Sequence, residues 1–180
     1  MHYDRGAVLR TRLLTSLVFN LVIAVWVFHD ARARGARKPG FAAVLALAWG
    51  PLGLGFWESD RPLRAGELRR GGAAATIARG FLTGWAALLP ALFVLAMQAV
   101  EHRAAVPGSL GRQIGLLPAT LVVASMMWGG PAVLALILGR LGRHGAAQHG
   151  SPATPAASVP SWVAAALAGT AALACALLTR

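Results

Sequence analysis

The sequence has 180 residues, of which 57% are hydrophobic and only 13% are charged, and its mean hydropathy is +0.61. Soluble domains carry about twice this share of charge, so the composition excludes an ordinary soluble globule and predicts an integral membrane protein. The net charge of +11 does not indicate nucleic-acid binding, because the cations flank apolar segments, where they set topology and meet anionic lipids.

Apolar stretches follow one another along the chain, and a helix that crosses a bilayer needs roughly 17 to 25 such residues. A membrane region at 1–141 contains four predicted spans, at 8–28, 40–57, 80–100 and 114–139. A flexible linker at 142–160 and a C-terminal span at 161–180 follow it. Continuous Leu- and Ala-rich runs indicate helices rather than barrel strands. The expected fold class is an all-α polytopic membrane bundle of five transmembrane helices. Four remain an alternative, because alanine supplies most of the segment at 161–180.

The first segment ends in an interface motif made of Trp26, Asp30 and Arg34. Tryptophan favours the membrane interface, and an acidic residue there is expected to form an ion pair with a nearby arginine. Within the segment, Asn20 is the notable polar side chain, and we expect it to hydrogen-bond to a neighbouring helix.

The second segment contains Gly50 and Pro51 a little past its middle. Pro51 has no amide hydrogen, and its ring clashes with the carbonyl of Leu47, so a kink is predicted. In hydrocarbon the freed carbonyl needs a partner, and Asn20 is the candidate. If 40–57 is instead a re-entrant hairpin, the two basic stretches beside it lie at the same side of the membrane.

Small residues recur at four-residue spacing along several segments. Such faces let helix backbones approach closely, and they predict packing against helices of this chain or of a partner. The residues concerned are Ala42, Ala46, Gly50, Gly80, Gly84, Ala164, Ala168, Ala172 and Ala176.

Residues that carry chemistry are scarce in the predicted spans. No histidine lies mid-helix, Cys175 is the only cysteine, and the interiors of the later segments hold no ionisable group. Haem ligation, a metal site and a proton pump are therefore disfavoured. We predict no catalytic residue, no metal and no cofactor within the chain, and contact with lipid or a carotenoid stays an option.

Residues 14–61 contain the Trp26 to Arg34 motif, then an apolar helix with the sequence Gly50-Pro51-Leu52-Gly53. This quarter of the chain resembles small bacterial and plastid membrane proteins of the abscisic-acid-deficient type, which are linked to neoxanthin formation. The resemblance implies a connection to carotenoids or photosynthetic membranes.

The function predicted first is a non-catalytic accessory subunit of a larger photosynthetic or respiratory membrane complex, whose partners are other integral membrane subunits and anionic lipids. The alternative is a membrane enzyme that modifies a carotenoid or another isoprenoid, with Asp30 and Arg34 taking part. The expected location is a bacterial inner or intracytoplasmic membrane. With five spans, ten of the seventeen cations lie on the side of the N-terminus, which places that end in the cytoplasm.

Overall fold

The computed structural model describes residues 5–64, 67–69, 71–104, 107–141, 148–149 and 159–179. These residues are mostly helical, which confirms the all-α fold class. The elements are α1 (Arg5–Ala33), α2 (Pro39–Trp49), α3 (Pro51–Asp60), β1 (Leu68–Arg69), α4 (Ala73–Ala104), α5 (Leu110–Ile114), α6 (Leu116–Leu141), β2 (Gln148–His149) and α7 (Ser161–Leu178). The two short strands β1 and β2 pair antiparallel.

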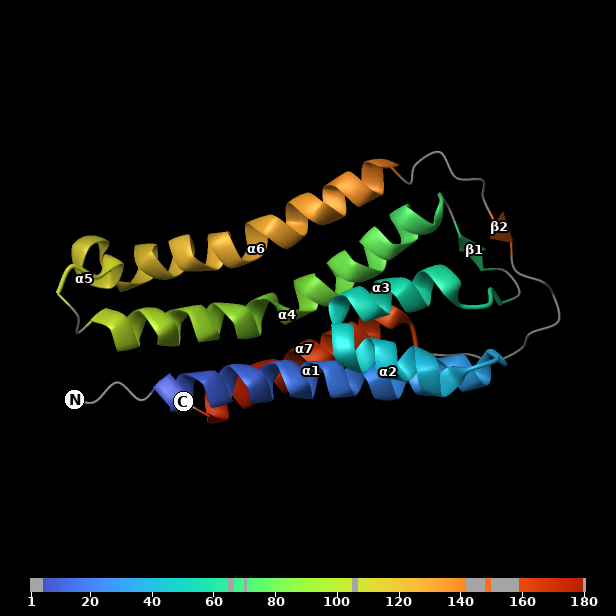
Figure 1. Cartoon of the computed structure of the whole chain (residues 1–180), viewed down its shortest axis with the longest axis horizontal. Helices are drawn as coiled ribbons and strands as arrows, with labels where there is room; N and C mark the ends of the chain where they lie inside the picture. Colours follow the sequence, from blue (N-terminus) through green and yellow to red (C-terminus); the bar gives the residue numbers. More distant parts are fainter. Residues whose placement is uncertain are drawn as a thin grey trace.

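Four long helices, α1, α4, α6 and α7, lie alongside one another, and α2 and α3 cover one half of the bundle (Figure 1). α7 packs against both α1 and α4, which touch each other little, while α6 packs against α4. The core is formed mainly by α1, α4 and α7, around Phe19, Ile23, Leu88 and Ala168. Helix α1 begins and α7 ends at the same end of the bundle.

Among the described residues, three helices are long and apolar enough to cross a membrane: Leu9–Ala33 within α1, Ala73–Glu101 within α4, and α7. The prediction of five spans is therefore not confirmed. The span predicted at 114–139 coincides with α6, a helix of 26 residues whose first charged residue is Arg140. Most of the predicted linker, 142–160, lies outside the described residues.

The segment at 40–57 differs most from the prediction, because it does not form one crossing helix. Helices α2 and α3 run in opposite directions and form a hairpin that enters and leaves the bundle at one end (Figure 1). Gly50 joins them with a positive φ of 50°, a conformation that favours glycine. Gly53 then packs on Ala46, where a Cβ on Gly53 would lie 2.5 Å from the Ala46 Cα. The expected kink at Pro51 is thus a complete reversal, with Pro51 as the first residue of α3.

The carbonyl group that Pro51 leaves without an intrahelical partner is capped from α1. The Asn20 side chain donates a hydrogen bond from Nδ2 to the Leu47 carbonyl oxygen at 2.9 Å, which is the contact expected from the sequence. This bond ties the tip of the hairpin to α1 about halfway along that helix. Membrane depth and proline chemistry together were sufficient to find it.

Replacing Asn20 with leucine is expected to lower the free energy of unfolding by roughly 1 kcal/mol, because the Leu47 carbonyl then lacks a donor. Denaturant titration of the detergent-solubilised protein, followed by circular dichroism, measures the change. Leu21→Ala serves as a control, since Leu21 is exposed on the outer side of α1. Equal stability of N20L and the wild type would contradict this role for Asn20.

The small-residue faces are used within the chain itself. Gly80 packs against Gly55, and Gly84 packs against Pro51, so both lie at the contact between α3 and α4. On α7 the small residues face α1 and α4 and are almost fully buried: Ala164, Ala168, Ala172 and Ala176. These stripes therefore close the bundle rather than offer a surface to a partner.

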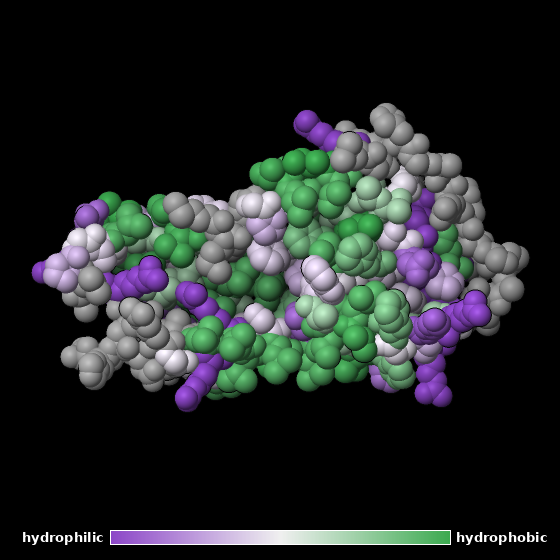
Figure 2. Space-filling view, viewed as in Figure 1, coloured by the Kyte–Doolittle hydropathy of each residue, from purple (hydrophilic) through white to green (hydrophobic). Residues whose placement is uncertain are grey.

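Large apolar side chains cover the outside of the bundle. In Figure 2 hydrophobic residues occupy the middle of the visible face, and hydrophilic residues gather toward its two ends. The exposed residues include members of three of the long helices: Leu13, Leu17 and Leu21 in α1, Leu121, Leu134 and Ile137 in α6, and Leu167 and Leu177 in α7. This distribution is compatible with a multi-pass membrane protein.

Candidate functional site: a buried ion-pair cluster and an adjacent cavity

Charged residues from two parts of the chain meet at the hairpin end of the bundle. Asp30 and Arg34 lie one turn apart at the C-terminal end of α1, and Arg64 and Glu67 follow α3. Because the hairpin returns the chain to the end where α1 finishes, residues about thirty positions apart become neighbours. Trp57, in the last turns of α3, completes the group, which we call the Asp30 cluster.

Arg34 is the centre of the Asp30 cluster, and its side chain is only 1% exposed. Its Nε donates to Asp30 Oδ2 at 2.8 Å, while Nη1 and Nη2 donate to the two carboxylate oxygens of Glu67 at 2.7 and 2.9 Å. Nη1 also donates to the Pro62 carbonyl oxygen at 2.8 Å. The planar guanidinium group thus holds two carboxylates and the loop after α3 in one arrangement, which a lysine could not reproduce.

Asp30 is equally buried and accepts hydrogen bonds from three elements. Besides Arg34, the indole Nε1 of Trp57 donates to Oδ2 at 3.0 Å, and Arg64 Nη2 donates to Oδ1 at 3.4 Å. Arg61 Nη1 lies 4.0 Å from Oδ2. The ion pair expected for Asp30 is therefore formed with Arg34, which is the closest arginine, and Arg61 lies at the limit of an ion pair.

Contacts within the Asp30 cluster shift the pKa values of Arg34 and Glu67. Burial alone lowers the pKa of Arg34, but the hydrogen bonds to Glu67 and Asp30 outweigh it, so the pKa is raised above its ordinary value. The hydrogen bond from Arg34, helped by the Arg64 backbone amide at 3.0 Å, lowers the pKa of Glu67 to about 2. Both groups are therefore charged at neutral pH, and their ion pair is present there.

The depressed pKa of Glu67 predicts an acid-sensitive stability. Glu67 has a pKa of about 2 in the folded protein against an ordinary 4.5, so its contribution is complete above pH 4.5 and is lost as the pH falls toward 2. Thermal unfolding of the wild type and of Glu67→Gln between pH 7 and pH 2 measures this. The wild type should lose more stability than E67Q across this window, and parallel pH profiles would contradict the assignment.

Trp26 does not join the Asp30 cluster. Its indole Nε1 donates to the Val159 carbonyl oxygen at 3.0 Å, just before α7 begins. Trp57, Arg64 and Glu67 were not predicted as site residues. The signal that would have found them is the hairpin alternative, because only a chain reversal at Gly50 brings the loop after α3 to the end of α1.

Beside the cluster lies a cavity of about 500 Å³ between α2, α3 and the segment that precedes α2. Trp57 belongs to both features, since its indole nitrogen binds Asp30 while its ring forms part of the cavity wall. The walls are mostly apolar, and the charged residues at the lining come from the basic end of the bundle: Arg37, Lys38 and Asp60. A volume of this size falls within the range of about 300 to 1,000 Å³ found for ligand pockets.

No protein-family model, curated protein or solved structure matches the chain. The resemblance of residues 14–61 to the abscisic-acid-deficient type therefore stays a prediction. Asp30, Arg34 and Trp26 from that stretch have roles that the geometry explains without it, in ion pairing and in hydrogen bonding to the chain's own backbone.

The arrangement is suited to holding elements together. Its carboxylates and guanidinium groups bond to one another, and neither Asp30 nor Arg34 lines the cavity. Within the described ranges, no three His, Cys, Asp or Glu side chains group as a metal site needs. The cavity is the part of this region that offers space to a ligand.

Proposed function

We propose that the protein is a non-catalytic accessory subunit of a larger membrane assembly, packed between helices and lipid or pigment. The observation that supports this most is the Asp30 cluster. Asp30 and Arg34 are each 1% exposed, and their side-chain hydrogen bonds go to groups of this chain: each other, Trp57, Arg64, Glu67 and the Pro62 carbonyl. Charges held in this way fix the hairpin on α1 and present no group to a substrate.

The surface of α6 supports a role in an assembly. Among the long helices, α6 packs chiefly against α4, and much of the rest of its circumference is exposed. Its outward residues are large and apolar, with no described charge before Arg140. The face fits a neighbouring membrane helix or lipid, and the resemblance of residues 14–61 favours a photosynthetic membrane.

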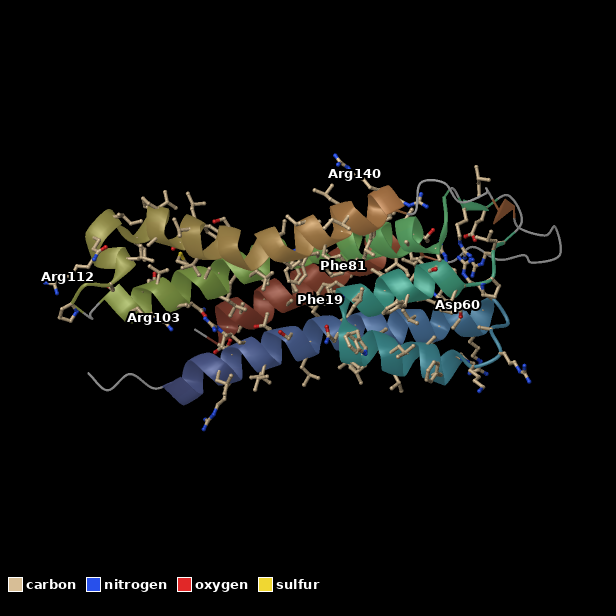
Figure 3. The ribbon with its side chains drawn as sticks, turned by 45° about the horizontal axis from the view of Figure 1, so that its top comes forward. Phe19, Asp60, Phe81, Arg103, Arg112 and Arg140 are labelled. Carbon is tan, nitrogen blue, oxygen red and sulfur yellow. The ribbon has the colours of Figure 1, made fainter. Side chains whose placement is uncertain are left out.

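The hairpin changes the topology that we propose for the membrane. Because the segment at 40–57 does not cross the membrane, the basic stretches before α2 and after α3 lie on the same side of it. Nine of the described cations lie at the hairpin end: Arg32, Arg34, Arg37, Lys38, Arg61, Arg64, Arg69, Arg79 and Arg140. Five lie at the other end: Arg5, Arg10, Arg12, Arg103 and Arg112. Figure 3 places Asp60 at the hairpin end and Arg103 and Arg112 at the opposite end. We therefore propose that the hairpin end faces the cytoplasm of a bacterial membrane, the reverse of the orientation expected from five spans.

Purification in a mild detergent tests the accessory role. Blue native electrophoresis and cross-linking should find the protein in an assembly larger than its own 18.7 kDa, with defined integral membrane partners. Recovery of a monodisperse monomer, with no partner cross-linked in native membranes, would refute the proposal.

The alternative, an enzyme acting on a carotenoid or other isoprenoid, would need Asp30 or Arg34 to reach the substrate. Their burial speaks against it, since the cavity lining excludes both. Deletion of the gene with pigment profiling separates the two functions. A missing xanthophyll together with an intact assembly would establish the enzyme, whereas an unchanged pigment profile with a destabilised assembly would support the subunit.

A further inference from the structure

We propose that the cavity between α2 and α3 binds an anionic membrane lipid, whose phosphate lies at Arg37 and Lys38. One hydrocarbon chain of that lipid lies between the arms of the hairpin, against Phe41, Leu45 and Phe56. The inference rests on the proposed membrane placement of the helices and does not require a partner subunit.

The lining of the cavity is mostly apolar. The small residues of the lining include Ala36, Ala42 and Gly53, and Phe41 and Phe56 flank the cavity with exposed aromatic rings. An opening lined by apolar side chains in the outer layer of a membrane bundle is filled by lipid chains, since water gains no hydrogen bonds there. The tail of the ligand is therefore a hydrocarbon.

Two cations lie at the edge of this apolar lining. Arg37 and Lys38 both line the cavity, both are exposed, and neither forms an ion pair with any described residue. By contrast, Arg34 pairs with Glu67, and Arg64 pairs with Asp30. Two adjacent cations beside an apolar cavity complement a lipid phosphate.

Asp60 is the acidic group of the lining, and the net charge of the charged lining residues is +1. Arg69 interacts electrostatically with Asp60, and the positive charge of Arg69 weakens the repulsion between Asp60 and a bound anion. The Ser59 hydroxyl, also at the lining, adds a hydrogen-bond donor for a phosphate oxygen.

Trp57 makes the cavity a preformed site. Because its indole nitrogen donates to the buried Asp30, the ring that walls the cavity is held in a single position. The Asp30 cluster thus stabilises the binding site indirectly, although none of its charges reaches the ligand.

Native mass spectrometry of the delipidated full-length protein tests the proposal, with phosphatidylglycerol and phosphatidylcholine of identical chains as the two probes. We expect the first phosphatidylglycerol to bind at least about tenfold more tightly than phosphatidylcholine. The double variant R37Q/K38Q should weaken phosphatidylglycerol binding by roughly ten- to thirtyfold. Phosphatidylcholine binding should fall much less, because its choline ammonium group already offsets the charge of its phosphate.

The matched control is R32Q/R140Q, which removes the same charge from the same end of the bundle at two exposed positions outside the cavity. It should bind phosphatidylglycerol like the wild type. Equal losses in the two double variants would show general surface attraction to anionic lipid and would overturn the site, as would full binding by R37Q/K38Q.

A variant that fills the cavity, Ala42→Phe, tests the hydrocarbon part separately and should weaken both lipids. Glycerophosphoglycerol, which is phosphatidylglycerol without its acyl chains, should not compete. Competition at lipid-like concentrations would overturn the lipid assignment in favour of a small phosphate. If A42F does not fold, the charge variants and the competition still decide the question. Because each titration uses the isolated protein, failure of this site leaves the accessory role untouched, and a monomeric protein would leave the lipid site intact.

Discussion

Replacing Arg34 with methionine is expected to lower the free energy of unfolding by about 3 to 5 kcal/mol, the cost of leaving a buried charge without its partner. Asp30 would keep its hydrogen bond from Trp57 but lose the 2.8 Å contact with Arg34, and Glu67 would lose both of its guanidinium donors. The hairpin should loosen as a result, since Arg34 also binds the Pro62 carbonyl in the loop after α3.

Denaturant unfolding in detergent measures the effect, and protease digestion of the loop after α3 reports the loosening. Arg34→Lys should be intermediate, because lysine keeps the charge but cannot donate to both carboxylates in the same plane. Arg32→Met is the control, as Arg32 lies on the same helix and is exposed. If R34M were as stable as R32M, the cluster would not hold the hairpin.

Replacing Gly169 with valine is expected to destabilise the bundle by about 3 kcal/mol, at the upper end of the usual cost of overpacking. Gly169 is buried in α7 and lies directly on the backbone of Ala87 in α4, where a Cβ would overlap the Ala87 carbonyl group. A backbone contact cannot be relieved by a side-chain rotation, so α4 and α7 have to move apart.

The same unfolding titration measures G169V, with Ala166→Val as its control on the exposed side of α7. Disulfide trapping between cysteines placed on α4 and α7 gives a second readout and should become slower in G169V. An unchanged unfolding midpoint with unchanged trapping would contradict this packing.

Sequence reasoning succeeded where the deciding chemistry is local. The apolar runs predicted helices because a bilayer leaves few alternatives, and Pro51 predicted an unpartnered carbonyl at Leu47 because the ring removes one donor. Asn20 was then the expected donor because it lies at a comparable membrane depth in the first segment, and the structure contains this hydrogen bond. The stripe of alanines in α7 was also visible, although the sequence does not show that its partners lie within the chain.

Length was a poor guide to the segment at 40–57. A run of eighteen apolar residues is long enough for one transmembrane helix and equally for a pair of short helices, so hydropathy cannot distinguish these two structures. The reversal depends on Gly50 adopting a positive φ and on Gly53 meeting Ala46, and both are properties of the folded hairpin. Arg64 and Glu67 could not be assigned for the same reason, since their places beside Asp30 exist only once the chain has turned back.

The position of α7 also has a consequence for the order of events during synthesis. α1 and α4 touch each other little, and each packs extensively against α7, which the ribosome makes after both of them. Until α7 emerges, the α4 surface around Ala87 has no counterpart, and lipid or a membrane chaperone must cover it. The hairpin and its ion pairs can form early, whereas the bundle closes only after residue 178 has been added.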